Sequence, residues 1–204
     1  MIDRLIARLK DTRPPVDLAR EALAPVPPEI AAQLFSGPLI PAAVLVGLVA
    51  RETGWEVLLT RRTEHLKDHP GQISFPGGRL DSPHESALAA ALREAQEEVG
   101  IEAEFIEVVG FLRPYAVITG YAVSPVVAVL RPGFSLKADA AEVAEIFAVP
   151  LRHLEDPANV THGERVVRGV TLPVLAYQYG PHHIWGATAQ ILGALLEKNH
   201  DHQE

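Results

Sequence analysis

The chain holds a run of acidic residues that could bind a divalent cation: Glu94, Glu97 and Glu98. On a helix, at 100° per residue, Glu94 and Glu98 project about 40° apart, and Glu97 widens the arc to about 100°. Like charges at these spacings repel one another, and a shared pocket raises their pKa values. A magnesium ion removes this repulsion, since it takes oxygen ligands and binds through one or two carboxylates plus phosphate oxygens. The spacing therefore predicts a metal site, with Glu94 and Glu98 as first ligands and Glu97 as a third.

The predicted helix that carries these acids has clear boundaries. Ser82, Pro83 and Glu85 match a capping box, and Gly100 matches a left-handed stop. On this reading Glu85 has a structural role, either in capping or in pairing with Arg93. A solvated acidic helix face is the plain alternative, because most runs of glutamate are exposed. The glycine turn at Gly77 and Gly78, just before the helix, favours a site instead, because glycine allows close approach of the backbone.

At this point the residues resemble the Nudix box of pyrophosphohydrolases. The motif G-x5-E-x7-R-E-U-x-E-E-x-G-U, with U aliphatic, aligns with residues 78–101, except that six residues separate Gly78 from Glu85 and alanine fills one aliphatic position. Residues 58–78 also resemble the signature L-L-T-x-R-S-x3-R-x3-G-x3-F-P-G-G of the coenzyme A pyrophosphatase branch, with Thr63 for Ser and Lys67 for Arg. The resemblance implies the family's α/β/α sandwich around a mixed β-sheet.

The resemblance also implies an activity and a set of site residues. The activity is Mg²⁺- or Mn²⁺-dependent hydrolysis of the pyrophosphate of coenzyme A or acyl-coenzyme A, giving 3′-phosphoadenosine 5′-phosphate and a 4′-phosphopantetheine product. A carbonyl at Gly77 or Gly78 would be a further metal ligand. Arg61, Arg62 and Lys67 would bind phosphates, although Arg62 could equally be an ordinary surface cation. The general base differs among Nudix enzymes; Glu145 is the first candidate and Glu142 the second, and both could instead face solvent.

Two alternatives to coenzyme A hydrolysis remain open at this stage. One is a Nudix hydrolase for another nucleoside diphosphate derivative, such as ADP-ribose or a dinucleotide. The other is a nucleotide or acyl-coenzyme A sensor that has lost turnover, although the complete set of Glu94, Glu97 and Glu98 argues against it.

Composition restricts the class of protein further. The 204 residues are 48% hydrophobic and 22% charged, which is ordinary for a soluble globular protein and far from a disordered composition. The net charge of −8 argues against nonspecific nucleic-acid binding. There is no cysteine, so thiolate metal sites and cysteine nucleophiles are excluded. The N-terminus lacks a signal-peptide core, and the longest apolar run is too short to cross a bilayer, which predicts a soluble cytoplasmic protein without membrane contact.

The pattern of prolines and apolar residues predicts the helices and strands that must position the acidic residues. Residues 1–40 are punctuated by proline and predict short helices in an extension that packs on the domain or takes part in a homodimer. Residues 41–199 predict the catalytic domain, and residues 200–204 a flexible tail. Within the domain, residues 42–50 and 55–60 predict a hairpin. Further strands are expected at residues 103–113, 121–130, 143–149, 160–167 and 170–178, before a closing helix at residues 187–198.

Overall fold

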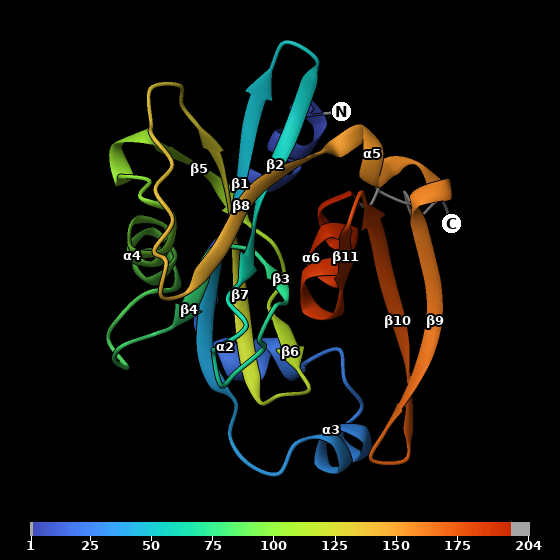
Figure 1. Ribbon diagram of the computed structural model, residues 1–204. Helices are drawn as coiled ribbons and strands as arrows, with labels where there is room; N and C mark the ends of the chain where they lie inside the picture. Colours follow the sequence, from blue (N-terminus) through green and yellow to red (C-terminus); the bar gives the residue numbers. More distant parts are fainter. Residues whose placement is uncertain (1, 197–204) are drawn as a thin grey trace.

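The computed structural model describes residues 2–196 and has three layers (Figure 1). A mixed sheet lies in the middle. Helix α4 (Ala87–Val99) covers one face, and helix α6 (Gly186–Leu196) lies on the other side together with a smaller sheet. The predicted α/β sandwich with a mixed sheet is therefore confirmed.

The central sheet is built around a long strand pair that runs parallel. Strands β1 (Ile40–Arg51) and β7 (Tyr121–Leu130) pair in parallel over ten residues, while the other pairings are antiparallel. The main path has the order β3-β2-β1-β7-β5, and β4, β6 and β8 pair with β1, β7 and β2 respectively. The remaining strands of this sheet are β2 (Gly54–Arg62), β3 (Ile73–Ser74), β4 (Gly77–Arg79), β5 (Ile106–Phe111), β6 (Tyr115–Val117) and β8 (Val143–Pro150).

The smaller sheet consists of β9 (Val160–Val167), β10 (Val170–Tyr179) and β11 (His182–Trp185), in the order β11-β10-β9. Short helical elements connect it to β8: α5 (Leu151–Glu155) and a 3₁₀ turn, η2 (Pro157–Asn159). Its middle strand, β10, contacts α6, so the sheet closes the core on the side away from α4.

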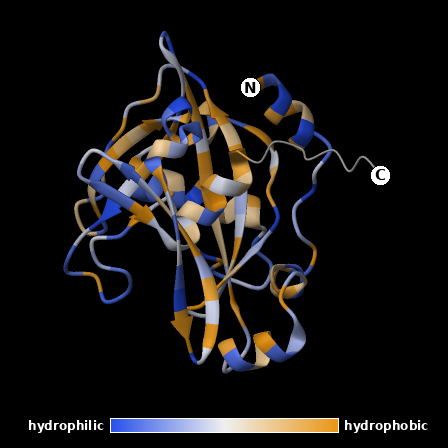
Figure 2. Ribbon diagram, turned by 90° about the vertical axis from the view of Figure 1, so that its right-hand side faces the viewer, coloured by the Kyte–Doolittle hydropathy of each residue, from blue (hydrophilic) through white to orange (hydrophobic). Residues whose placement is uncertain are grey.

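Two apolar clusters lie on opposite faces of the central sheet, because side chains alternate along each strand. In β2, Val57 and Leu59 belong to the cluster beneath α6 and β11, while Leu58 belongs to the cluster beneath α4. In β1 the same alternation separates Val46 from Leu45, both fully buried. Figure 2 shows hydrophobic residues, in orange, recurring along the strands and helices between hydrophilic ones, in blue. This alternation decides which charged residues at the strand ends can meet.

The N-terminal segment forms short helices, as its prolines predict: α1 (Ile2–Leu9), α2 (Leu18–Leu23) and α3 (Pro28–Leu34). Leu5 and Leu9 are buried in the same cluster as β1, and Nη2 of Arg8 donates to the carbonyl oxygen of Leu195 at 2.8 Å. The apolar face of α1 is thus covered by the chain's own core and is no free surface for a homodimer. The division at residue 40 stays a prediction.

Most predicted strands are confirmed, including the hairpin of β1 and β2 and the bounds of β7 and β9. Two predictions about element starts are wrong. Residues 103–105 form a 3₁₀ turn, η1, and β5 begins only at Ile106. Helix α4 begins at Ala87 with Ser86 as N-cap, four residues after the predicted Ser82. The closing helix is described to Leu196; its predicted last two residues and the predicted tail at residues 200–204 lie outside the described residues.

Among residues 2–196, no helix is long and apolar enough to cross a membrane.

Candidate functional site

Helix α4 holds the acidic residues between two well-defined ends. The Ser86 hydroxyl accepts a hydrogen bond from the N–H of Ala89 at 3.1 Å, and Gly100 ends the helix with a φ of 75°. Ala90, Ala91 and Ala95 are fully buried against the sheet, so the helix packs closely on β1. Ala90 therefore belongs to the apolar core between α4 and the central sheet.

Glu98 is buried at the junction of α4 and the central sheet, with 3% of its surface exposed. Its Oε2 accepts a hydrogen bond of 3.1 Å from the N–H of Gly77, and its Oε1 lies 3.6 Å from Nη1 of Arg62. Burial raises the pKa of Glu98 to about 8, with smaller contributions from Glu94 and Glu142 against the opposing effect of Gly77 and Arg62. A buried acid with this pKa is readily neutralised by a proton or by a cation.

Glu94 lies one turn earlier and packs against Gly78. A Cβ added at Gly78 would collide with the Glu94 carboxylate, its Cδ standing only 2.6 Å away, so this close approach requires glycine. Nη1 of Arg93 donates to Oε1 of Glu94 at 2.8 Å. The pKa of Glu94 is nevertheless raised, chiefly by burial, with Glu97 and Glu142 adding to the effect and Arg93 opposing it. Glu94 and Glu98 are thus both partly desolvated and repel each other.

Gly77 and Gly78 belong to strand β4, which pairs with residues 42–44 of β1, and not to the predicted turn. The pairing explains the first glycine, because a Cβ at Gly77 would meet the backbone of β1, with the Cα of Val44 at 2.7 Å. A strand placed this close to β1 brings the Gly77 N–H to Glu98 and the Gly78 Cα to Glu94.

Arg93 joins the acidic face to the loop that precedes the helix. Its guanidinium donates to Oε1 of Glu85, to Oε2 of Glu97 and to the carbonyl oxygen of Arg79, each at 3.0 Å. Arg93 lowers the pKa of Glu85, which confirms the predicted structural pairing of these two residues. The Glu97 side chain is 60% exposed, so among the three predicted acids it is the one that faces solvent.

The two adjacent arginines of β2 lie on opposite faces of the sheet. Arg62 faces α4: its side chain is 20% exposed, and its guanidinium lies 3.6 Å from Glu98 and 4.0 Å from Glu142. Its Nε is buried and has no hydrogen-bond partner among the described residues. Arg61 points to the other face, where its Nε donates to Oε2 of Glu145 at 3.2 Å. Lys67 is exposed in the loop after β2.

The structure separates the two candidate bases in the same way. Glu142 contributes to the raised pKa values of both Glu94 and Glu98, so it belongs to the acidic cluster on the α4 side. Oε1 of Glu145 instead lies 3.4 Å from Nε2 of His182, whose ring stacks on Phe147 at 3.9 Å between centroids. No local feature of the sequence indicates this contact of His182, because β11 and β8 meet only in the folded chain.

The acidic cluster has the donor chemistry that a hard cation needs. Among the described residues, no three carboxylate or imidazole groups stand ready in a metal-holding arrangement. Magnesium does not require such a cage, since one or two carboxylates, waters and substrate phosphates complete its coordination. Glu94 and Glu98, desolvated and mutually repelling, fit this role, and Arg93 now occupies one oxygen of Glu94.

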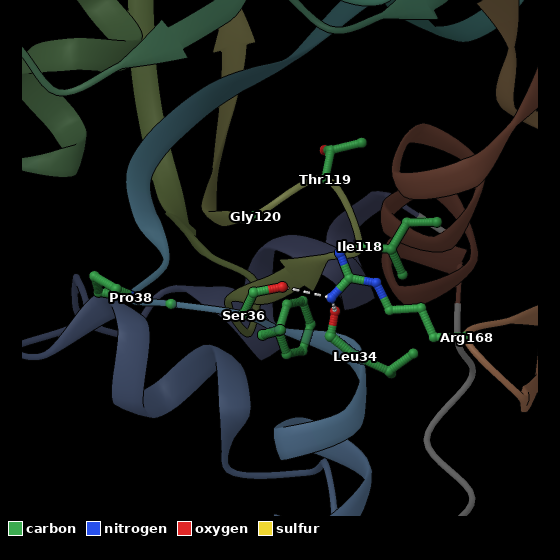
Figure 3. Close-up of a pocket in the computed structure, with 9 residues that line it drawn as sticks. Leu34, Ser36, Pro38, Ile118, Thr119, Gly120 and Arg168 are labelled. Carbon is green, nitrogen blue, oxygen red and sulfur yellow. Dashed lines mark hydrogen bonds between the residues drawn. The ribbon is translucent and has the colours of Figure 1, made fainter.

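A separate pocket lies between the N-terminal segment and Arg168 and does not include these acids. It has a volume of about 210 Å³ between the loop after α3, the turn before β7 and Arg168 (Figure 3). Arg168 donates to Oγ of Ser36 at 2.7 Å and to the carbonyl oxygen of Leu34 at 2.9 Å. These bonds attach the tip of the β9–β10 hairpin to the N-terminal segment, which explains the pocket as a structural junction.

Several known proteins are similar to this chain. The family model described as NUDIX domain matches residues 39–168. "Uncharacterized Nudix hydrolase NudL" from Photorhabdus laumondii is 41% identical over 77% of this chain and 83% of its own length. The protein of the same name from Enterobacter sp. is 42% identical over 76% and 80%. A solved structure, a C. elegans Ap4A hydrolase binary complex, aligns with a TM-score of 0.48 at 23% identity, covering 54% of this chain and 80% of its own.

Proposed function

The chain belongs to the Nudix hydrolase family, and from this premise we propose that it hydrolyses the pyrophosphate bond of coenzyme A or acyl-coenzyme A. Water adds to one phosphorus, the bridging P–O bond breaks, and the products are 3′-phosphoadenosine 5′-phosphate and (acyl-)4′-phosphopantetheine. Within the family, the choice of coenzyme A rests on residues 58–78, whose signature resembles that branch.

The observation that carries the proposal is the position of Glu98. It is a buried carboxylate, bonded to the N–H of Gly77, beside Glu94 and Arg62. A purely structural acid at this depth would be closely paired, since an uncompensated buried charge costs several kcal/mol, roughly. Arg62 stands at 3.6 Å from Glu98 and the pKa of Glu98 remains raised, so the pairing here is incomplete. This is the arrangement of a carboxylate kept available for a cation.

We assign the metal to Glu94 and Glu98, with Glu97 and a backbone carbonyl at Gly78 as further oxygen ligands. When bound, Mg²⁺ or Mn²⁺ would polarise the phosphate oxygens and make a bound water more acidic. Hydrogen bonds within the chain hold these carboxylates in position: the Gly77 N–H orients Glu98, and Arg93 restrains Glu94 and Glu97.

The basic residues divide between the two faces of β2. Arg62 stands beside the acids, where its guanidinium would bind a phosphate oxygen. Arg61 and Lys67 are available for the remaining phosphates, including the 3′-phosphate that distinguishes coenzyme A. Glu142 and Glu145 remain the candidates for the base that takes the proton from the attacking water. Glu142 lies on the side of Glu98, because its Oε2 is 4.0 Å from Nη2 of Arg62 and its charge raises the pKa of Glu98.

The test is to identify products by mass spectrometry after incubation with coenzyme A and Mg²⁺ or Mn²⁺, in parallel with acetyl-coenzyme A, ADP-ribose and a dinucleotide. Metal-dependent formation of both predicted products from coenzyme A supports the proposal. Cleavage of ADP-ribose without cleavage of coenzyme A would replace it with another Nudix activity. Absence of hydrolysis in wild type and in Glu98→Gln alike, with nucleotide still bound, would show a sensor.

A further inference from the structure

Strand β9 is an exposed edge strand at the outside of the small sheet. Its neighbour is β10, and among the described residues no other strand pairs with its outer edge. All of its residues from 161 to 166 are exposed on both faces, and Val166 is 67% exposed. Figure 1 shows β9 on the far side of β10 and β11 from the central sheet, so its outer edge is open. Such an edge offers unpaired N–H and C=O groups to another strand.

The geometry of the β9–β10 turn determines which residues of β9 direct their backbone N–H and C=O groups away from β10. Arg168 and Gly169 have φ angles of 49° and 80°, the positive pair that a two-residue type I′ turn requires. The flanking residues Val167 and Val170 then form a hydrogen-bonded pair, and along an antiparallel ladder such pairs alternate with non-hydrogen-bonded ones. The backbone groups of Val160, His162, Glu164 and Val166 therefore point away from β10.

Pro173 independently confirms which β9–β10 pairs are hydrogen-bonded and which are not. It lies opposite Glu164 in the β9–β10 register. A proline has no N–H to donate, so in a sheet it occupies a position that needs no ladder bond. The Glu164–Pro173 pair is thus of the non-hydrogen-bonded kind, which again leaves the backbone groups of Glu164 directed at the open edge.

We propose that β9 is a homodimer interface, in which β9 of a second copy of this chain pairs with it in antiparallel fashion around a two-fold axis at Gly163. A symmetric pair joins the same strand to itself, and the outward residues must meet each other. When the pair of strands is centred on Gly163, three kinds of residue pair result. His162 lies opposite the partner's Glu164, Thr161 opposite the partner's Arg165, and Val160 opposite the partner's Val166.

The charges of the facing residues and the length over which the two strands overlap favour the Gly163-centred register over registers centred on adjacent residues. A pair centred on Glu164 places this carboxylate opposite the partner's Glu164, and a pair centred on Arg165 places two guanidinium groups together; like charges in direct opposition destabilise a strand pair. A pair centred on His162 leaves Val166 beyond the end of the partner strand. The Gly163 register forms four hydrogen-bonded pairs and, at two bonds per pair, about eight hydrogen bonds.

Cysteine cross-linking reads the register directly, because the chain contains no cysteine. Gly163 and the partner's Gly163 would form a non-hydrogen-bonded pair with Cα atoms about 4.5 Å apart, which a disulfide can span. A Cβ at Gly163 meets no atom within 4 Å, so Gly163→Cys keeps the fold. Mild oxidation of the full-length Gly163→Cys protein is expected to give a covalent dimer on a non-reducing gel.

Thr161→Cys is the matched control on the same exposed strand. In the proposed register, Thr161 and the partner's Thr161 are four residues apart along the pair, about 13 Å, beyond the reach of a disulfide. Thr161→Cys should stay monomeric on the gel. A Gly163→Cys protein that fails to cross-link, or a Thr161→Cys protein that cross-links equally well, overturns the proposed pairing.

Sedimentation velocity tests the charge pairing without cross-linking. Wild type should sediment with twice the 22.1 kDa of one chain at high protein concentration. His162→Glu places a carboxylate opposite the partner's Glu164, so this variant should shift to monomer. Adding Glu164→Lys to His162→Glu restores opposite charges and should restore the dimer. Hydrolase activity and the circular dichroism spectrum serve as folding controls. A wild type that is monomeric at every concentration, or a double variant that remains monomeric, contradicts the proposal.

Discussion

The main-chain N–H of Gly77 donates a hydrogen bond of 3.1 Å to Oε2 of Glu98, joining the short strand β4 to the buried end of helix α4. The bond holds a carboxylate in a place where burial alone would favour its neutral form. Because a Cβ at Gly77 would collide with the backbone of β1, only glycine lets the strand come this close. The sequence Gly77-Gly78 and the acid run of α4 therefore act as one structural unit.

Glu98→Gln should keep the fold and lose most metal-dependent hydrolysis. Glutamine can still accept the Gly77 hydrogen bond through its amide oxygen, and it removes a buried charge. We expect kcat to fall by at least two orders of magnitude, roughly what the loss of one strong electrostatic contact in a transition state costs. Steady-state kinetics and circular dichroism measure both effects, and an unfolded variant would point to a structural role for Glu98.

The raised pKa of Glu98 predicts a pH dependence of stability in the metal-free protein. The unfolded chain releases this proton near the ordinary glutamate pKa, whereas the folded chain holds it up to about 8. Stability from this group is therefore present at low pH and is lost as pH rises from about 4.5 to 8, by a few kcal/mol at about 1.4 kcal/mol per pKa unit.

Urea denaturation of wild type and Glu98→Gln in EDTA, at pH 5 and pH 8, isolates this contribution from the other charges. The difference in unfolding free energy between the two proteins should move in favour of Glu98→Gln on going to pH 8. An equal difference at both pH values would mean that Glu98 titrates normally.

Gly77→Ala and Gly78→Ala should fail in different ways. At Gly77 the new methyl meets the β1 backbone, which cannot move aside, so the fold loses stability. At Gly78 it meets the Glu94 carboxylate, which can rotate away, so stability falls little while activity falls and the metal concentration for half-maximal activity rises. Thermal unfolding and metal titration separate the two. Gly163→Ala is the control, since its Cβ meets open space.

Arg93→Lys should loosen the segment before α4. A lysine ammonium cannot reproduce the fork that reaches Glu85, Glu94 and the carbonyl oxygen of Arg79 together, so we expect a loss of about 1 to 3 kcal/mol of stability. Chemical denaturation measures the loss, and hydrogen exchange at residues 80–86 should rise. Arg131→Lys is the matched control, because Arg131 and Glu107 form an exposed pair at 58% exposure each, whose net contribution is within about 1 kcal/mol.

Glu142→Gln and Glu145→Gln test the two candidate bases. A residue that takes a proton from water should lower kcat and change its pH profile when replaced. We expect this result for Glu142, which shares the α4 side with Glu98. Glu145→Gln should mainly raise KM by releasing Arg61, since its carboxylate accepts from the Arg61 guanidinium. A large fall in kcat for Glu145→Gln with none for Glu142→Gln would return the role of base to Glu145.

The parts of the fold that depend on local pattern were predictable. The local sequence predicted β7 and β9 with correct bounds, and the prolines predicted short helices in the N-terminal segment, where the structure has α1, α2 and α3. The start of α4 was not, because two serines, Ser82 and Ser86, each precede an acceptable first turn. The contact of Arg93 with Glu85 and the Arg79 carbonyl holds residues 82–85 outside the helix, and sequence alone does not show it.

By itself the sequence determined the family: acids at helical spacing, glycines ahead of them and a basic segment upstream match the Nudix signature. Only the tertiary structure decided which of these groups face one another. Arg61 and Arg62 are neighbours in the chain, yet the alternation of β2 sends one to Glu145 and the other to Glu98. Likewise Glu98 became the buried acid and Glu97 the exposed one, because the packing of α4 on β1 and β4 sets the depth of each side chain.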